Sequence, residues 1–193
     1  MVDTLHPILE RAAAGSLPEW AVVTPTRKLH TERVSKLMAK WARRLDLSDT
    51  DVKRWAAAGL LHDALRDADP ELLRGTIPDD TSDIHPSLLH GPAAAHRLRQ
   101  EGVEDEPLLL AIAYHTLGHP EMDRLGMTLC AADFLEPGRS SLRKLRKKLR
   151  KRMPRKYKNV VRRILKLRIR SNLSANRVLP SQTTDLWNRL SHG

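Results

Sequence analysis

A chain of 193 residues is long enough for one well-buried domain, and the scarcity of alternating Val/Ile runs, with one Phe and two Tyr, predicts an all-α fold. No apolar run approaches about eighteen residues, so we expect no membrane span. Because Cys130 is the single cysteine, we expect neither an internal disulfide framework nor a cysteine-based zinc module, and we expect a reducing, cytoplasmic location. The formal net charge of +11 is unevenly spread: residues 137–184 contain 18 Lys/Arg and no Asp or Glu, which leaves a net charge of −7 elsewhere.

The second predicted helix carries polar residues on the side that should face the core. A short helix is expected over residues 3–14, and the next begins at Thr24-Pro25, where a capping residue precedes a proline in the first turn. The apolar positions between Val34 and Leu45 follow a 3.6-residue period. His30 and Arg27 lie four and seven residues before Val34, so they extend the inward stripe towards the helix start.

The third predicted helix, from Ser48 to about Asp69, carries an imidazole and a carboxylate side by side. Its start resembles a capping box. His62 and Asp63 point about 100° apart on a helix, so one ion lying between the two directions would be within reach of both. A hydrogen-bonding neighbour is the alternative partner, because an unpaired buried charge is costly.

Three further helices carry a polar residue at one end. Residues 75–87 are predicted to be an irregular surface loop. Pro92 then suits the first turn of a helix whose start at His90 would favour an anion such as phosphate. The next helix closes its apolar row at His115, and the sixth closes its row at Asp133.

The same feature therefore recurs on five segments: a His or an Asp at or next to a helix end. For any one residue, a hydrogen-bonded core histidine is the more frequent explanation, but five occurrences are harder to dismiss. Helix ends that meet would gather these side chains into one inward-facing pocket. Four histidines and two aspartates suffice for one metal ion or for two ions bridged by a carboxylate, and such donors without thiolate suit Fe, Mn, Zn or Mg. These residues are His30, His62, Asp63, His90, His115 and Asp133.

The basic segment is predicted to form two amphipathic helices, separated near Pro154, whose apolar sides dock on the body. Such charges usually form a solvated face. Because so many cations without an acidic residue exceed what solubility requires, contact of residues 143–170 with RNA or another polyanion is the alternative. This alternative predicts a steep salt dependence. The near absence of aromatic residues, Tyr157 apart, argues against recognition of single strands by stacking.

Five blocks between residues 24 and 140 carry a family resemblance, and a weaker similarity covers residues 179–188. The blocks are Arg27-Lys-Leu-His30, His62-Asp-Ala-Leu-Arg66-Asp, His90-Gly-Pro-Ala-Ala, Tyr114-His115-Thr-Leu-Gly118 and Ala132-Asp133-Phe-Leu-Glu136-Pro-Gly-Arg139. Together they resemble the YqeK-type bacterial symmetrical diadenosine-tetraphosphate hydrolases, a subgroup of the HD-domain metal-dependent phosphohydrolases. Two departures are Arg66, where lysine is expected, and a C-terminal segment that is more basic than the family norm.

The resemblance implies an all-α HD-domain helical bundle, residues 1–138, with a basic helical C-terminal extension, residues 139–193, packed on it. It also implies hydrolysis of diadenosine tetraphosphate at its centre to two ADP, with Asp63, His90 and His115 as catalytic residues. An iron-like divalent ion, with Mn, Zn or Mg as alternatives, would be held by His30, His62, Asp63 and Asp133. His90 and His115 would face either a second ion or the substrate phosphates. Substrate contacts would come from Arg27, Arg66, His90, His115, Thr116, Asp133 and Arg139.

Two other functions stay open from the sequence. One is an HD phosphohydrolase of other nucleotide specificity, such as a nucleotidase or a cyclic-nucleotide phosphodiesterase. The other is an RNA-binding or ribosome-associated regulatory protein that uses the basic C-terminal segment. A homodimer stays open as well.

Overall fold

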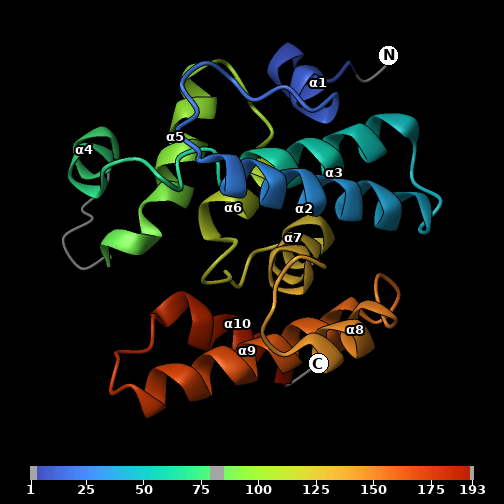
Figure 1. Ribbon diagram of the computed structural model, residues 1–193, viewed down its shortest axis with the longest axis vertical. Helices are drawn as coiled ribbons and strands as arrows, with labels where there is room; N and C mark the ends of the chain where they lie inside the picture. Colours follow the sequence, from blue (N-terminus) through green and yellow to red (C-terminus); the bar gives the residue numbers. More distant parts are fainter. Residues whose placement is uncertain (1–3, 79–84, 192–193) are drawn as a thin grey trace.

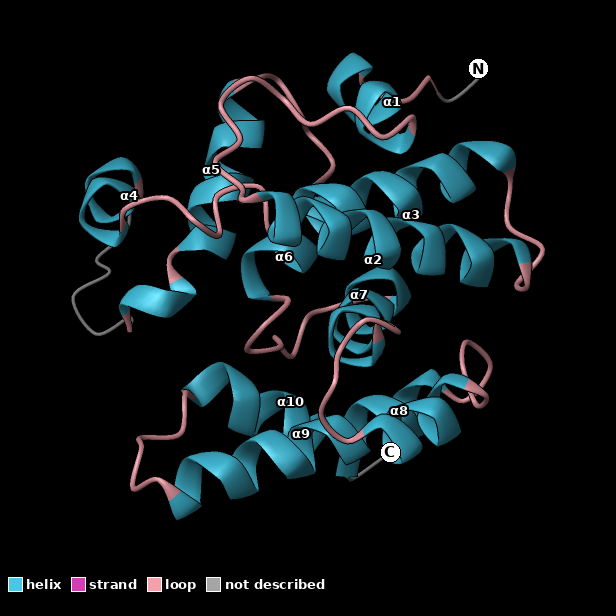
Figure 2. Cartoon of the chain, in the orientation of Figure 1, coloured by secondary structure: helices cyan, strands magenta, loops and turns pink. Residues whose placement is uncertain are grey.

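The computed structural model describes residues 4–78 and 85–191, and every regular element in these ranges is a helix (Figures 1 and 2). The all-α fold expected from the composition is therefore confirmed. A short 3₁₀ helix, η1 (Pro86–Leu88), directly precedes α5. The α-helices are α1 (Pro7–Ala13), α2 (Pro25–Arg43), α3 (Asp49–Leu61), α4 (Pro70–Thr76), α5 (His90–Gln100), α6 (Glu106–Tyr114), α7 (Arg124–Leu135), α8 (Arg143–Arg150), α9 (Tyr157–Ser174) and α10 (Ser181–Ser191).

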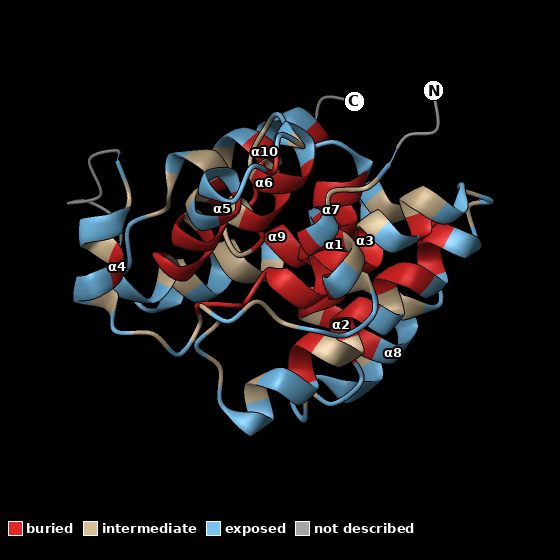
Figure 3. Cartoon of the chain, turned by 90° about the horizontal axis from the view of Figure 1, so that it is seen from above, coloured by how far each residue is buried: buried red, intermediate tan, exposed pale blue. Residues whose placement is uncertain are grey.

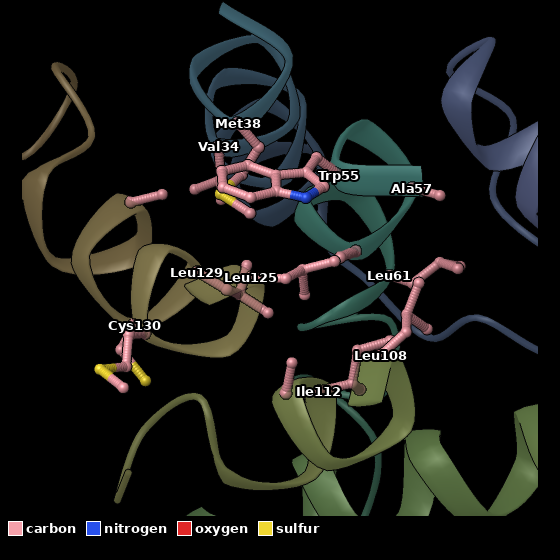
Figure 4. Packing of buried hydrophobic residues seen from close by; sticks show 14 of the residues in the cluster. Val34, Met38, Trp55, Ala57, Leu61, Leu108, Ile112, Leu125, Leu129 and Cys130 are labelled. Atoms are coloured by element: carbon pink, nitrogen blue, oxygen red, sulfur yellow. The ribbon is translucent and has the colours of Figure 1, made fainter. Parts of the chain in front are cut away.

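Helix α7 lies between two groups of helices. On one side are α1 to α6, among which α2 and α3 pack side by side, and on the other are α8 to α10 (Figure 1). Buried side chains from both groups form one hydrophobic cluster. Figure 3 colours the buried stretches of the helices red, and Figure 4 shows the part of the cluster that lies between α2, α3, α6 and α7. The cluster joins Trp41 and Leu61 to Leu129 of α7 and Ile164 of α9. The C-terminal helices thus share a core with the rest, and a domain boundary after residue 138 stays a prediction.

The starts of α2 and α3 follow from local sequence. The Thr24 side chain accepts a hydrogen bond from the Arg27 amide (3.3 Å), and Pro25 occupies the first turn. The Ser48 hydroxyl accepts from the Asp51 amide (3.1 Å). Each cap satisfies an amide that the helix itself leaves unpaired, which stabilises a helix by about 1 kcal/mol. Both predicted starts are confirmed.

Two predicted helix boundaries are wrong. The helix expected from residue 3 begins at Pro7, because the His6 ring accepts a bond from the Ile8 amide and caps the helix there; residues 1–3 lie outside the described chain. Helix α3 ends at Leu61 and not near Asp69. His62 and Asp63 therefore lie in the turn that follows the helix.

The segment before α2 holds that turn in place. The Val22 amide donates to the Ala64 carbonyl (2.8 Å), and the Asp67 amide donates to the Val22 carbonyl (3.2 Å). The Thr24 amide donates to the Asp67 carboxylate (2.7 Å). The first two bonds satisfy the Ala64 carbonyl and the Asp67 amide, which a longer helix would have paired within itself.

The segment after this turn differs in part from the predicted irregular loop over residues 75–87. Helix α4 occupies residues 70–76, where the Asp69 side chain accepts from the Glu71 amide and Pro70 lies in the first turn. Residues 79–84 of the predicted loop lie outside the described chain.

Two glycines let pairs of helices approach at the backbone. A Cβ atom added to Gly59 of α3 would lie 2.7 Å from the Ser35 Cα atom of α2. One added to Gly91 of α5 would lie 2.5 Å from the Ala113 carbonyl oxygen of α6. A larger residue would push the helices apart at either place. Because His62 and His90 lie close to these glycines in sequence, the two contacts also help to set their positions.

The basic segment forms two helices, α8 and α9, separated by a turn that contains Pro154, as predicted. Leu149 and Ile164 are buried in the common core, whereas most Lys and Arg side chains are exposed. Within the described residues, no helix combines the length and apolarity that a bilayer span requires.

The basic segment also caps the end of α7. Arg139 Nε donates to the Asp133 carbonyl oxygen (2.9 Å), and Arg150 Nη1 donates to the Leu135 carbonyl oxygen. The last carbonyls of a helix have no partner within it and carry its negative dipole end, so arginine is a favourable partner there.

Candidate metal and phosphate site

Four buried histidines surround the carboxylate of Asp63. Its Oδ1 atom lies 3.1 Å from His90 Nε2 and 3.3 Å from His115 Nε2. Its Oδ2 atom lies 3.6 Å from His62 Nε2 and 3.7 Å from His30 Nε2. Each imidazole turns the same nitrogen towards this one residue.

Asp133 completes the cluster from α7, with its Oδ1 atom 3.2 Å from His30 Nε2. His30 lies in α2, His62 directly follows α3, His90 begins α5 and His115 directly follows α6. Contacts among these helices bring their ends together. All six predicted residues are buried. The structure therefore gathers every candidate ligand in one place.

Three of the histidines are oriented by backbone carbonyls. The Nδ1 atoms of His62, His90 and His115 lie 2.9, 3.0 and 2.8 Å from the carbonyl oxygen of the residue three positions earlier. A carbonyl only accepts, so Nδ1 carries the proton and, in a neutral ring, the Nε2 lone pair faces the cluster. For His30 the neighbour is a carboxylate, with Nδ1 3.4 Å from Glu136 Oε1. Metal-binding histidines are commonly held in this way.

Burial favours neutral imidazoles at this site, whereas the carboxylate stays ionised. It lowers the pKa of His62 to about 4 and also lowers the pKa of His90. Burial alone would raise the pKa of Asp63, but its interactions with His62, His115 and His90 hold that pKa well below the ordinary value. At neutral pH the cluster therefore combines nitrogen lone pairs with negative oxygen.

This donor set fits a divalent cation. Among the described residues, the buried Nε2 atoms of His30 and His62 form no hydrogen bond, although carboxylate oxygens lie close to both, and a buried nitrogen without a hydrogen bond is costly in a folded protein. His90 Nε2 and His115 Nε2 lie 3.2 Å apart beside the Asp63 carboxylate, so a bound cation would offset the repulsion between two facing lone pairs. Two overlapping groups each place one ligand atom per residue within 4.8 Å of one another. They are His30, His62 and Asp133, and His62, Asp63 and His115.

Arginines line an open pocket beside the cluster. Arg27 Nη1 donates to Asp63 Oδ2 (2.8 Å), and Arg139 Nη2 pairs with Asp133 Oδ1. With Arg33 they line a pocket of about 350 Å³ that borders the cluster. Guanidinium groups bind phosphate through two parallel hydrogen bonds. The pocket therefore suits a phosphate chain lying next to the candidate metal ligands.

Two predicted substrate contacts lie at the edge of the cluster. Arg66 Nη1 donates to the Ser87 carbonyl (3.1 Å), the same oxygen that His90 Nδ1 contacts. Thr116 is partly exposed, and its carbonyl oxygen accepts from Arg168. Their assignment to substrate binding stays a prediction.

Sequence reasoning missed Glu136 and Arg168, which contact the cluster, and Arg33, which donates to Glu136. Glu136 is buried, faces His30 and accepts from Arg33 Nε (2.7 Å) and from the Gly138 amide (2.8 Å). Burial opposes ionisation of Glu136, but its bond from Arg33 helps to lower its pKa overall. Helical spacing offered a signal, because Arg33 follows His30 by one turn and Arg168 closes an apolar row on α9.

The sequence profile of the HD domain matches residues 27–138. The chain is 33% identical over 124 residues to the symmetrical bis(5'-nucleosyl)-tetraphosphatase of Bacillus subtilis. This alignment covers 61% of this chain and 65% of that protein. The chain is 32% identical over 137 residues to the protein of the same name from Staphylococcus aureus, covering 68% and 66%. The match thus spans slightly less than two thirds of these curated relatives.

One solved structure resembles nearly the whole chain. It is described as a predicted HD superfamily hydrolase involved in NAD metabolism, from Clostridium acetobutylicum. The TM-score is 0.78 at 25% sequence identity, covering 88% of this chain and 91% of the other. The resemblance therefore extends beyond the region matched by the profile and includes at least part of the C-terminal helices.

Proposed function

This chain belongs to the HD domain family, and we propose that it is a metal-dependent phosphohydrolase that cleaves diadenosine tetraphosphate symmetrically to two ADP. The observation that carries the proposal is the buried cluster of imidazoles and carboxylates, in which two imidazole nitrogens form no hydrogen bond to any described residue. The names of the curated relatives support this choice of substrate.

His30, His62, Asp63 and Asp133 would hold the divalent ion, with Fe proposed and Mn, Zn or Mg as alternatives. His90 and His115 would face a second ion or the substrate phosphates. A bound divalent ion supplies Lewis acidity and a water of near-neutral pKa. Elemental analysis of freshly purified protein identifies the metal and separates one ion from two.

The side chains around the cluster would bind and orient the substrate. Arg27 and Arg139, joined by Arg33, would hold the phosphate chain and offset its charge while the bridging P–O bond breaks. We also assign Arg66, Thr116 and Asp133 to the substrate. Asp63 would orient the attacking water by accepting a hydrogen bond. The Nε2 atoms of His90 and His115 are the positions at which a proton would be held and passed to the leaving phosphate.

Product analysis tests the reaction. The metal-loaded protein is incubated with diadenosine tetraphosphate, and the nucleotides are separated by anion-exchange chromatography. Symmetrical cleavage gives ADP alone, whereas AMP with ATP would overturn this specificity. Turnover of another nucleotide with no reaction here would favour an HD phosphohydrolase of different specificity.

Polyanion binding by residues 143–170 is a second candidate function, alone or beside hydrolysis. Lys147, Lys148 and Lys151 are exposed on and just after α8, where the apolar Leu149 is buried in the core. Because the apolar side of α8 is already buried in the core, it is not free to insert into a lipid bilayer. The exposed lysines are therefore better suited to contact phosphate groups. We therefore expect duplex RNA to bind with an affinity that falls steeply between 50 and 200 mM salt, on the order of 10³-fold for six phosphate contacts. Salt-independent binding, or none, would overturn this candidate.

A homodimer and a cytoplasmic location also stay predictions, and so does a boundary between residues 138 and 139. Light scattering on the purified chain measures the oligomeric state. Limited proteolysis tests the boundary, because a separable extension would be cleaved first near residues 138–142.

A further inference from the structure

Arg168, on α9, reaches the cluster from the C-terminal side. Its Nη2 atom lies 3.6 Å from Asp133 Oδ2, and its Nη1 atom donates to the carbonyl oxygen of Thr116. Thr116 directly follows His115. One guanidinium group therefore bridges the turn after α6 and the last turn of α7, two segments that carry candidate metal ligands.

Helical register directs this side chain inward. Val161, Ile164 and Leu165 precede Arg168 by seven, four and three residues, and all three are buried. Arg168 closes their row, and its side chain is 21% exposed. An arginine in this position can pack its stem along apolar neighbours and extend its charged end to polar groups. His30 also ends an apolar row, on α2, but at its N-terminal side, four residues before Val34.

Asp133 consequently has a cationic partner at each oxygen. Arg139 pairs with Oδ1, the oxygen that also faces His30, and Arg168 lies near Oδ2. A carboxylate held at both oxygens has little freedom to rotate. Partners of this kind set the orientation of metal ligands, and their loss typically weakens metal binding about 10–100-fold.

We propose that Arg168 is a positioning residue that holds the Asp133 carboxylate and the turn after His115 in the arrangement that binds the divalent ion. The inference rests on the metal site proposed above. It makes α9, from the basic segment, part of that site. Arg168 is thus distinct from the exposed cations around it, which face solvent.

Binding of Mn²⁺ to the metal-free 193-residue chain tests the role. Arg168→Gln is compared with Arg163→Gln, which removes the same charge from an exposed position on the same helix. We expect Arg168→Gln to bind Mn²⁺ about tenfold more weakly or worse, and Arg163→Gln to stay within about twofold of the wild type. Arg168→Lys should give an intermediate loss, because lysine keeps the charge but lacks the fork that bridges two acceptors.

Thermal unfolding of the metal-free variants separates positioning from a simple structural tether. A lower Tm for Arg168→Gln with wild-type Mn²⁺ affinity would overturn the proposal, and so would an equal loss of affinity in Arg163→Gln. If Arg168→Gln does not fold, Arg168→Lys decides, and an affinity within about twofold of the wild type would then refute the role. Because Mn²⁺ binding needs no substrate, failure to hydrolyse diadenosine tetraphosphate would overturn the proposed reaction and leave this result intact.

Discussion

Polar and charged side chains are buried in the cluster around Asp63, whereas most of those on the basic helices α8 and α9 are exposed. In the cluster, four histidines and two aspartates are buried and lie against one another. In the basic helices, most Lys and Arg side chains are exposed, while residues such as Leu149 and Ile164 enter the core. Removing charged groups from water costs free energy, whereas solvated charges cost little.

This contrast indicates where function should be sensitive to mutation. A buried polar cluster in which nitrogens form no hydrogen bond to the described residues opposes folding unless a ligand completes it, so each member should matter to binding or chemistry. Exposed cations act through long-range, salt-screened attraction, and single changes among them should matter little. Arg139 and Arg168 belong to the basic segment by sequence but to the cluster by contact.

The largest effect should come from His62→Ala, which removes a fully buried candidate ligand. We expect loss of the bound divalent ion and a drop in kcat/KM of at least about 1000-fold, because residues that act as a unit fail together. Helix content by circular dichroism should persist. His96→Ala, which changes a histidine outside the cluster, serves as the control. Full activity in His62→Ala would contradict the site.

Acid should weaken the metal-free protein through the same histidine. The pKa of His62 is about 4 in the folded chain, against an ordinary value of 6.5, so the unfolded chain binds the proton first as the pH falls. Protonation of His62 therefore leaves the free energy of unfolding unchanged above about pH 6.5 and lowers it as the pH falls towards 4. The free energy of unfolding, measured by urea denaturation, should fall by about 3 kcal/mol between pH 7 and pH 4. An unchanged pH dependence in His62→Gln would contradict this origin.

Glu136→Gln should weaken the site without removing a ligand. The carboxylate faces His30 and accepts from Arg33, so its loss should lower metal affinity or kcat/KM about 10–100-fold. Glu106→Gln is the matched control, since it breaks an exposed pair with Arg99. The control should stay near wild type, and equal losses in both variants would refute a specific role for Glu136.

Gly91→Ala should destabilise the fold by about 1–3 kcal/mol, because the added Cβ meets the backbone of α6. The Cβ of Gly75→Ala would meet no atom of the described residues within 4 Å, so this variant should be neutral or stabilised by up to about 1 kcal/mol. Urea unfolding measures both. Equal stability of the two variants would show that α5 and α6 can separate freely.

The smallest effect is expected for the double change Lys147→Gln and Lys148→Gln on the exposed face of α8. Stability should change by less than about 0.5 kcal/mol, and hydrolysis should stay at the wild-type level. Affinity for duplex RNA should fall if the polyanion candidate is correct. A large loss of hydrolysis would contradict the claim that exposed cations of α8 contribute little to the site.

Local sequence was sufficient for most helices and for the six residues of the cluster. Thr24-Pro25 and Ser48 predicted the starts of α2 and α3 because caps act within one turn of the chain. The row from His30 to Val34 predicted an inward histidine because helical register repeats every 3.6 residues. Both signals need nothing beyond neighbouring residues.

Tertiary contacts decided the end of α3 and the partners of the cluster. The residues after Leu61 could continue a helix, but Val22 and Thr24, some forty positions away in the sequence, bond the turn instead. Charge alone does not distinguish Arg168 from the other 17 basic residues of the segment; its contact with Asp133 follows from the packing of α9 beside α7. Local patterns specify which face a side chain takes, whereas the identity of its partner depends on where the rest of the chain lies.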